Sequence, residues 1–302
     1  MLNGAFPILL TAFDDKDALD LGAIGALLDF YRELGLPGVL ALGQASEMLL
    51  LDDEERFRVA EFVGGHPRGN LAAAVVGNFG ATLAEQARSL QRIYDMGADV
   101  VVVALSLLPS AEGLGEQLLE LAGMVKPDTR LGVYEIPEPE HRLLSPAEAG
   151  EIAGSGRYYF MKETSRDPEI FRGKVKAAAG SGLKIYQANL KALPPSMEMG
   201  SAGFCGWMPM VAPELCAQVC DMSLPAALRR LAHDKLTAFN DVMVAHGFPA
   251  SAKHILAGRG IPIQPYSREG AARKFFEIGS AALDDYIARN APFAAVSFAE
   301  EA

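Results

Sequence analysis

Residues 158 to 164 read Tyr158-Tyr159-Phe160-Met161-Lys162-Glu163-Thr164, an apolar run that ends abruptly in a lysine. Short apolar runs of this kind are typical of a strand that is buried on both faces, as in a parallel sheet. We therefore predict a strand at Tyr158–Met161. A strand that enters a hydrophobic core normally ends before a cation, so Lys162 needs an explanation of its own.

Similar runs recur on both sides of this strand, and longer amphipathic segments separate them. This alternation indicates repeated βα units around a parallel sheet. Strands are predicted at Phe6–Phe13, Gly38–Leu42, Leu71–Val76, Asp99–Ala104, Leu131–Glu135, Tyr158–Met161, Leu183–Gln187 and Gly203–Gly206, and helices at Leu21–Leu34, Asp52–Val63, Thr82–Met96 and Pro146–Ala153. These strands predict an α/β fold, a (β/α)8 TIM barrel, whose usual length is about 250 residues.

The last part of the chain shows no strand-like alternation. Helices are predicted there at Leu224–Ala245, Ser251–Ala257 and Arg268–Arg289. We therefore predict a (β/α)8 barrel at residues 1–212 and a C-terminal helical extension packed on it at residues 213–302. No linker rich in Pro, Gly and Ser, no internal repeat and no charge block divides the sequence.

The composition favours a soluble protein that acts on a small molecule. The chain has 302 residues, of which 50% are hydrophobic and 22% are charged, enough for a large core. Its net charge of −11 argues against nucleic acid or an anionic membrane as partners, since both require a basic surface. The apolar run Phe6–Phe13 is short and lacks preceding basic residues, so it predicts neither a signal peptide nor a membrane span. We expect a cytoplasmic protein.

The cysteines and histidines do not form a metal-binding pattern. Cys205, Cys216 and Cys220 are interpreted as reduced core residues, with the last two on one face of a helix. The five histidines are scattered, with no paired ligand motif at strand ends. We therefore predict no metal site, and chemistry at a lysine imine would need no cofactor.

Lys162 is the candidate nucleophile. Burial disfavours the ammonium form, so a desolvated lysine has a lowered pKa and attacks a carbonyl to form a Schiff base. The alternative is a lysine that merely extends from a strand end to water. The chemistry of (β/α)8 barrels lies at the carboxyl ends of the strands. Other polar segments follow the second, fifth and seventh predicted strands, at Gly43–Glu47, Tyr134–Pro137 and Gln187–Asn189.

With these motifs the sequence resembles the pyruvate-dependent class I aldolases and lyases, the family typified by dihydrodipicolinate synthase and N-acetylneuraminate lyase. The resemblance covers nearly the whole chain and depends on the order and spacing of motifs that are individually weak. The motifs are Pro7–Phe13 with Asp20, Gly43–Glu47 followed by Leu51 and Glu54–Arg56, Gly77–Thr82, Gly97–Asp99, Tyr134 with Pro137, Lys162–Glu163, and Gly200–Gly206 running to Pro213.

The resemblance implies a mechanism for Lys162, which would form an imine with the keto carbon of pyruvate or of a longer 2-keto acid. The imine is then the electron sink for making or breaking a carbon–carbon bond. Tyr134 is implied to relay protons near the imine, although on its own it is equally read as a packing residue. The resemblance also implies a homo-oligomer, either a dimer or a tetramer.

The same resemblance implies how the substrate carboxylate is held. Main-chain N–H groups of Gln44 and Ala45 would bind it, with Ser46 or Gln44 as a further side-chain donor. Glu135 is read either as an alternative acid or base or as a solvated strand-end carboxylate. His141 is interpreted as a loop residue. The complete set of candidate substrate-binding residues is Gln44, Ala45, Ser46, Glu135, Asn189, Cys205 and Gly206.

Three departures from the family pattern bear on the substrate. Gln44 and Ala45 fall where the family loop carries the hydroxyls of a proton relay, and Leu105–Leu108 has no phenol where neighbouring subunits usually exchange a tyrosine. Pro139 falls near the arginine with which dihydrodipicolinate synthase binds a distal carboxylate, and only Arg142 remains nearby. We therefore expect the protein to be a poor dihydrodipicolinate synthase. The aldehyde portion of its own substrate is expected to be hydroxylated, aromatic or otherwise uncharged.

The sequence thus predicts a Schiff-base lyase or aldolase that acts on a 2-keto acid, with pyruvate as product or donor and an aldehyde as the other partner. One alternative uses the same imine to dehydrate a 2-keto-3-deoxy sugar acid. An alternative of another class is a catalytically impaired barrel that binds a ligand or regulates a partner.

Overall fold

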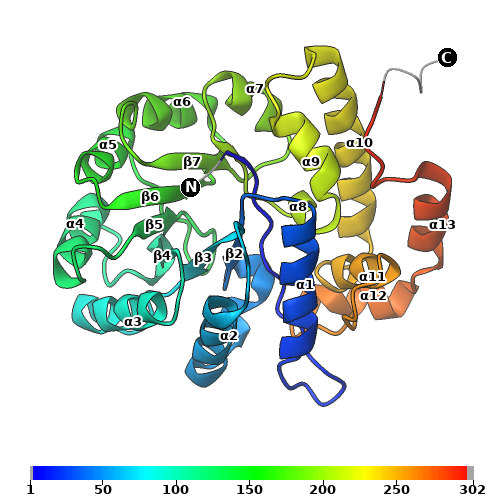
Figure 1. Cartoon of the computed structure of the whole chain (residues 1–302), viewed down its shortest axis with the longest axis horizontal. Helices are drawn as coiled ribbons and strands as arrows, with labels where there is room; N and C mark the ends of the chain where they lie inside the picture. The colour runs from blue at the N-terminus through cyan, green and yellow to red at the C-terminus, as the bar shows by residue number, and fades with distance from the viewer. Residues whose placement is uncertain (1–2, 298–302) are drawn as a thin grey trace.

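In the computed structural model, which describes residues 3–297, eight parallel strands follow one another around a barrel (Figure 1). The strands are β1 (Gly4–Ala5), β2 (Gly38–Ala41), β3 (Ala72–Val76), β4 (Val100–Ala104), β5 (Leu131–Tyr134), β6 (Tyr158–Glu163), β7 (Lys184–Gln187) and β8 (Gly203–Phe204). They pair in the order β1-β8-β7-β6-β5-β4-β3-β2, and a bridge between Ile8 and Leu40 closes the ring. The predicted TIM barrel is confirmed.

Helices pack around the outside of the strands and connect each strand to the next (Figure 1). The connecting helices are α1 (Leu21–Glu33), α2 (Asp53–Gly65), α3 (Leu83–Asp95), α4 (Leu114–Met124), α5 (Pro146–Gly154), α6 (Pro168–Ala177) and α7 (Leu193–Glu198), with 3₁₀ turns η1 (Gln44–Ser46), η2 (Met48–Leu50) and η3 (Leu105–Leu107). Capping boxes at Asp52, Thr82 and Ser145 fix the starts of α2, α3 and α5. The helices predicted from these signals are therefore present.

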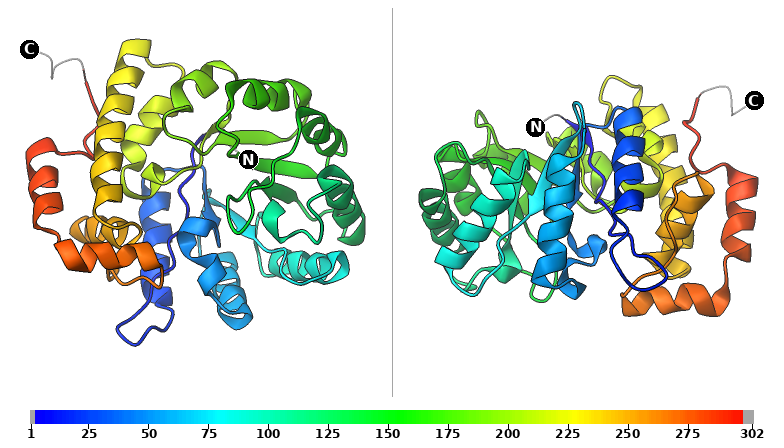
Figure 2. Two further views of the ribbon diagram at one scale, coloured as in Figure 1. Left: turned by 180° about the vertical axis from the view of Figure 1, so that it is seen from behind. Right: turned by 60° about the horizontal axis from the view of Figure 1, so that its bottom comes forward.

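After β8 the described chain continues as helices. They are α8 (Met208–Val211), α9 (Pro213–Cys220), α10 (Ala226–Ala245), α11 (Ala250–Gly258), the 3₁₀ turn η4 (Gly270–Ala272), α12 (Arg273–Ile278) and α13 (Ala281–Asn290). Helix α9 packs against β1 and α10, and Figure 2 shows α10 to α13 gathered on one side of the barrel. The expected C-terminal helices are present, and the boundary at residue 212 stays a prediction.

The first predicted strand, Phe6–Phe13, is wrong in extent, because only Gly4–Ala5 forms a ladder. Pro7 has no N–H to donate to a neighbouring strand. The chain beyond Ala5 still follows β2, since the Leu40 amide donates to the Pro7 carbonyl at 2.9 Å and the Leu9 amide donates to the Leu40 carbonyl at 2.9 Å. This segment therefore completes the barrel through isolated hydrogen bonds.

The predicted helix Arg268–Arg289 is divided into α12 and α13. Gly279 interrupts it with a φ of +72°, a conformation that glycine adopts without a Cβ clash and that ends α12. None of the helices between residues 3 and 297 is both long and apolar enough to cross a membrane.

A β-bulge between β5 and β6 sets which side chains of β6 enter the barrel. Leu131 pairs with Tyr158, but the next residue, Gly132, pairs with Phe160. The extra residue reverses the alternation along the strand. The Tyr158 hydroxyl donates to the Leu118 carbonyl of the outer helix α4, whereas the Phe160 ring packs against other aromatic rings of the barrel, Phe6 and Tyr186. Lys162, two residues beyond Phe160, therefore faces inward above this aromatic layer.

Candidate active site

A cavity of about 310 Å³ opens at the carboxyl ends of the strands. This is the edge at which (β/α)8 enzymes carry out their chemistry. The residues that line the cavity lie at or just after β2, β5, β6, β7 and β8: Gln44, Tyr134, Pro137, His141, Lys162, Thr164, Ser165, Arg166, Ala188, Asn189, Gly206 and Trp207.

Lys162 differs from the other buried lysines in having no anionic partner. Lys162, Lys174 and Lys253 are 3%, 0% and 0% exposed. Lys174 and Lys253 both form ion pairs with buried glutamates. Lys162 has no hydrogen bond or ion pair with any residue from 3 to 297, and its Nζ lies 4.3 Å from the centre of the Tyr134 ring. Burial lowers the pKa of Lys162, so the reactive free amine is favoured.

Strand pairing places a phenol beside this amine. Tyr134 on β5 lies directly opposite Lys162 on β6. The Tyr134 hydroxyl forms no hydrogen bond within the described part of the chain, although the residue is buried and lines the cavity. Burial raises the pKa of Tyr134, so the group remains a protonated phenol at neutral pH. The Tyr134 hydroxyl is therefore left without a protein partner in the described chain, at the wall of the cavity.

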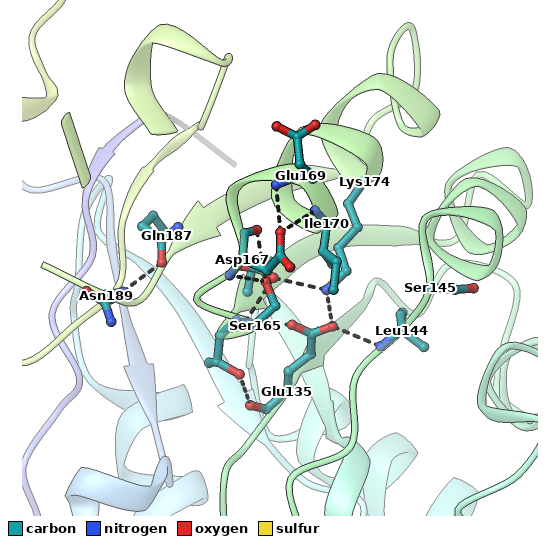
Figure 3. Close-up of polar contacts among 12 residues, drawn as sticks. Glu135, Leu144, Ser145, Ser165, Asp167, Glu169, Ile170, Lys174, Gln187 and Asn189 are labelled. Atoms are coloured by element: carbon teal, nitrogen blue, oxygen red, sulfur yellow. Dashed lines mark hydrogen bonds and ion pairs between the residues drawn. The ribbon is translucent and has the colours of Figure 1, made fainter. Parts of the chain in front are cut away.

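Glu135 follows Tyr134 and Glu163 follows Lys162 along their strands. Because successive side chains of a strand point to opposite faces, the two glutamates face the outer helix α6. There they share the ammonium of Lys174, whose Nζ lies 2.5 Å from Glu135 Oε1 and 3.0 Å from Glu163 Oε1. All three side chains are fully buried. Figure 3 shows Lys174 reaching down from α6 to the carboxylate of Glu135. Glu135 therefore lies behind the cavity wall, not among the lining residues.

Further hydrogen bonds fix Glu135 and connect it to the cavity. Its carboxylate accepts from the amides of Leu144 at 2.9 Å and Thr164 at 3.0 Å. The Thr164 hydroxyl donates to the Glu135 carbonyl at 2.6 Å and lies 2.8 Å from Nε2 of His141, a cavity residue. Burial raises the pKa of Glu135 to about 7, with Lys174 opposing the shift and Glu163 adding to it. The network is therefore a buried polar support beneath one side of the cavity.

The predicted carboxylate-binding loop is η1, but its residues are placed differently. Gln44 lines the cavity, whereas Ala45 and Ser46 are buried beside it. The Ser46 hydroxyl is already engaged, since it donates to the Leu9 carbonyl at 2.6 Å. The amides of Gln44 and Ala45 are the first in the 3₁₀ turn, where no intrahelical acceptor exists. Main-chain donors thus stay available at the place the sequence predicted, and the Ser46 side chain points elsewhere.

A buried ion pair ties this loop to the C-terminal helices. Glu47 ends η1 with a φ of +63°, a strained conformation for a residue other than glycine. Its carboxylate accepts from Lys253 Nζ on α11 at 2.7 Å, from the Ser267 hydroxyl at 2.8 Å and from the Arg268 amide at 2.7 Å. The extension therefore holds the loop in position.

Asn189 and Gly206 line the cavity as predicted candidates, and Cys205 is buried beside Lys162. The amide of Asn189 donates to the Gln187 side chain at 2.8 Å, which orders the end of β7 (Figure 3). A Cβ at position 206 would lie 2.5 Å from the Phe204 ring and 2.9 Å from the Ala188 carbonyl, so only glycine fits there. Burial raises the pKa of Cys205 to about 11, which keeps it a thiol.

Several cavity residues were not predicted. Thr164, Ser165 and Arg166 follow β6 directly, and this position after a strand was the available signal. His141, interpreted as a loop residue, does lie in a loop, but it also lines the cavity. Trp207 comes from the start of α8. The cysteines are free thiols, and no metal-binding group of three His, Cys, Asp or Glu side chains occurs within residues 3–297.

An unpaired, desolvated amine at the carboxyl mouth of a (β/α)8 barrel, beside a phenol on the next strand, defines the class of barrel enzymes that work through a lysine imine. The chain belongs to the dihydrodipicolinate synthetase family, whose model matches residues 1–274. Members of this family are class I Schiff-base aldolases and lyases.

Comparisons with individual proteins agree with this assignment. The 4-hydroxy-tetrahydrodipicolinate synthase of Pseudomonas putida is 26% identical over 269 residues, which cover 86% of this chain and 89% of the relative. The fold is similar to that of YagE from E. coli in complex with pyruvate, with a TM-score of 0.78, 20% identity, and coverage of 94% of this chain and 99% of that one. CdNal from Clostridium difficile, solved with mannosamine, gives a TM-score of 0.79 at 16% identity, with coverage of 92% and 98%.

Proposed function

We propose that this protein is a lyase or aldolase that captures a 2-keto acid as an imine on Lys162, with pyruvate as the product or the donor. The observation that carries the proposal is the contrast between the buried lysines. Lys174 and Lys253 are held by glutamates, whereas the amine of Lys162 faces the cavity without a partner in the described chain. A buried cation without a counter-ion is costly unless the group is neutral or has a function.

In the cleavage direction, the neutral Lys162 amine attacks the C2 carbonyl, and loss of water gives the imine. The C3–C4 bond then breaks, its electron pair moves to the protonated imine to form an enamine, and the proton of the C4 hydroxyl leaves as the aldehyde forms. Tyr134 relays this proton, because its ring centre lies 4.3 Å from the amine and its residue lines the same cavity. Protonation of the enamine at C3 and hydrolysis release pyruvate and the free lysine.

The main-chain amides of Gln44 and Ala45 are assigned to binding the substrate carboxylate. A cytoplasmic location and a homo-oligomeric state also remain predictions. Apart from water, the proposed steps use groups of the chain itself. The aldehyde half of the substrate is identified by incubating the purified protein with a panel of 2-keto acids and analysing the products. Release of pyruvate together with an aldehyde supports cleavage, and release of a dehydrated keto acid would assign the sugar-acid dehydratase reaction in its place.

We further propose that dihydrodipicolinate synthesis is not the main activity. Gln44 carries no relay hydroxyl and η3 carries no phenol. Arg142, the arginine nearest to Pro139 in the sequence, donates to the carbonyls of Leu108 at 2.7 Å and Ser110 at 3.1 Å and is not a cavity residue.

We expect kcat/KM for aspartate semialdehyde to be at least about a hundredfold below that for the preferred substrate, the scale of one lost acid–base group. A coupled assay at constant pyruvate measures both. Equal efficiencies would show that other groups have replaced the missing relay.

A further inference from the structure

A second hollow of about 320 Å³ adjoins the cavity that contains Lys162. Arg166, Ala188, Asn189 and Trp207 line both, so the two spaces share one wall. The second hollow extends away from Lys162 toward Lys191, in the turn between β7 and α7, and Asn240 on α10. A substrate whose keto group reaches Lys162 therefore has room to extend past Arg166.

The two spaces differ in charge from the rest of the molecule. The chain carries a net charge of −11, with 38 acidic and 27 basic residues. Among the described residues that line either space there is no Asp or Glu, while Arg166 and Lys191 are cationic. Clefts with one sign of charge concentrate ligands of the opposite sign. The exclusion of carboxylates from both spaces, in a protein this acidic, points to an anionic ligand.

Arg166 is the residue best placed to bind that anion. It has a φ of +61°, a region that side-chain-bearing residues rarely occupy and that often marks functional sites. Its guanidinium forms no hydrogen bond or ion pair within residues 3–297, unlike Arg142, which is used by main-chain carbonyls. Arg166 also lies close enough to His141 to help burial lower the pKa of that imidazole. The guanidinium is therefore a free, planar donor for a carboxylate or phosphate.

We propose that the two spaces form one site for a doubly anionic substrate, a 2-keto acid with a second carboxylate or a phosphate at its far end. Lys162 captures the keto group, and Arg166 with Lys191 binds the distal anion. This inference rests on the function proposed above for Lys162. It replaces the expectation of an uncharged aldehyde portion, which considered only the arginine nearest to Pro139 in the sequence. The proton relay missing for dihydrodipicolinate synthesis is not restored by a distal anion.

The test compares matched 2-keto acids by borohydride trapping of the imine. The first arm consists of the 2-keto derivatives of pentanoate, hexanoate and heptanoate. The second arm consists of the 2-keto dicarboxylate of equal chain length for each of them. The third arm is a six-carbon 2-keto acid with a terminal phosphate. We expect the half-maximal trapping concentration of at least one doubly anionic compound to be about tenfold to a hundredfold lower than that of its partner, the usual scale for a charge-assisted contact. The dicarboxylate and phosphate arms identify which anion is preferred.

Variants assign the preference to the proposed residues. Arg166→Ala should remove most of the difference within a pair, and Lys191→Ala should reduce it. Arg88→Ala is the matched control, because Arg88 is an exposed guanidinium on α3 that lines neither space. Equal trapping of both members of every pair by the natural protein, or a preference that survives in the Arg166→Ala/Lys191→Ala double variant, would overturn the proposal.

An imine-independent measurement separates this inference from the function on which it rests. Isothermal titration calorimetry with adipate and with inorganic phosphate probes the anion site without a keto group. Binding that is lost in Arg166→Ala supports the anion site even if no keto acid is trapped, in which case the Lys162 function alone fails. The opposite outcome is that pyruvate is trapped while Arg166→Ala changes neither the trapping difference within the keto-acid pairs nor the binding of these anions. In that case the function of Lys162 stands and the anion site is rejected.

Discussion

Tyr134 and Lys162 are neighbours across two paired strands, so their separation is set by the barrel itself. The amine lies over the face of the phenol ring, 4.3 Å from its centre. Both side chains are almost completely buried, and neither has a hydrogen-bond partner in the described chain. Two desolvated polar groups without hydrogen-bond partners are costly to bury, and the proposed imine and its substrate would supply the missing partner.

The first prediction at this scale concerns the Tyr134 hydroxyl. Tyr134→Phe removes only one atom from a buried ring, so the fold and the borohydride-trapped imine should persist. Turnover should fall by about two to four orders of magnitude, the usual contribution of a positioned acid–base group. Steady-state kinetics with the preferred 2-keto acid measures the change, and near-native turnover would make Tyr134 a packing residue.

A second prediction follows from the raised pKa of Glu135, about 7 in the folded protein. The folded state then holds a proton that the unfolded chain releases near pH 4.5, so this group makes the free energy of unfolding fall as pH rises from about 4.5 to about 7. Glu135→Gln removes that dependence. Relative to the natural protein, the variant should therefore gain stability with rising pH across this window.

Urea unfolding at pH 5, 6 and 7 measures the effect, which is limited to about 1.4 kcal/mol per pH unit. Glu112→Gln is the control, since Glu112 is an exposed carboxyl outside this buried network. A constant difference between Glu135→Gln and the natural protein over this range would show that Glu135 is ionised throughout.

At the scale of single elements, the sequence predicted the strands best where they are continuous apolar runs. It failed at Phe6–Phe13, where Pro7 interrupts the ladder, and it ended β6 at Met161 because a charged residue followed. The alternation between inward and outward side chains also depends on a bulge that no local pattern reveals. Lys162 was singled out because a cation ends an apolar run, whereas the role of Tyr134 was implied only by the resemblance to the aldolase family.

The position of Glu135 was not predictable for a different reason. Its partner Lys174 lies 39 residues further along the chain and meets it only when α6 packs on the barrel. A strand-end carboxylate reads as a solvated or catalytic group until that helix is placed. Similarly, Arg166 has no motif of its own, and its importance follows from the cavity and its backbone conformation.

The closure of the barrel between β8 and β1 yields a prediction at this scale. Gly203 has a φ of +151°, and a Cβ there would lie 1.9 Å from the Gly4 carbonyl oxygen. Gly203→Ala should lower the free energy of unfolding by about 2–6 kcal/mol through overpacking and backbone strain. Gly154→Ala, at the end of α5 with no atom within 4 Å of the added Cβ, is the matched control and should not destabilise. Chemical denaturation measures the free energy of unfolding of both variants. Equal values for Gly203→Ala and Gly154→Ala would show that the close approach of β8 to β1 does not require glycine.

At the scale of the whole molecule, the C-terminal helices do more than cover the barrel. Lys253 reaches from α11 to Glu47, and both side chains are almost completely removed from water. Glu47 and Lys253 are separated by 206 positions in the sequence. The loop that carries Gln44 and Ala45 is therefore fixed by a distant segment of the chain. The helical extension thus belongs to the architecture of the active site.

Lys253→Met should leave the Glu47 carboxylate buried without its cation and lower the free energy of unfolding by about 3–5 kcal/mol. The freed loop should also raise the pyruvate concentration needed for imine trapping. Lys274→Met, which removes an exposed lysine from α12, should change stability by no more than about 0.5 kcal/mol. An unchanged trapping curve in a folded Lys253→Met protein would show that the extension does not position the loop.

We expect Lys162, alone among the buried lysines, to form the imine. Incubation with pyruvate and borohydride, followed by peptide mass spectrometry, shows where the adduct forms. One reduced pyruvyl adduct is expected, on the peptide that contains Lys162, and none in the Lys162→Met variant. An unmodified protein, or an adduct on Lys174 or Lys253, would contradict this expectation.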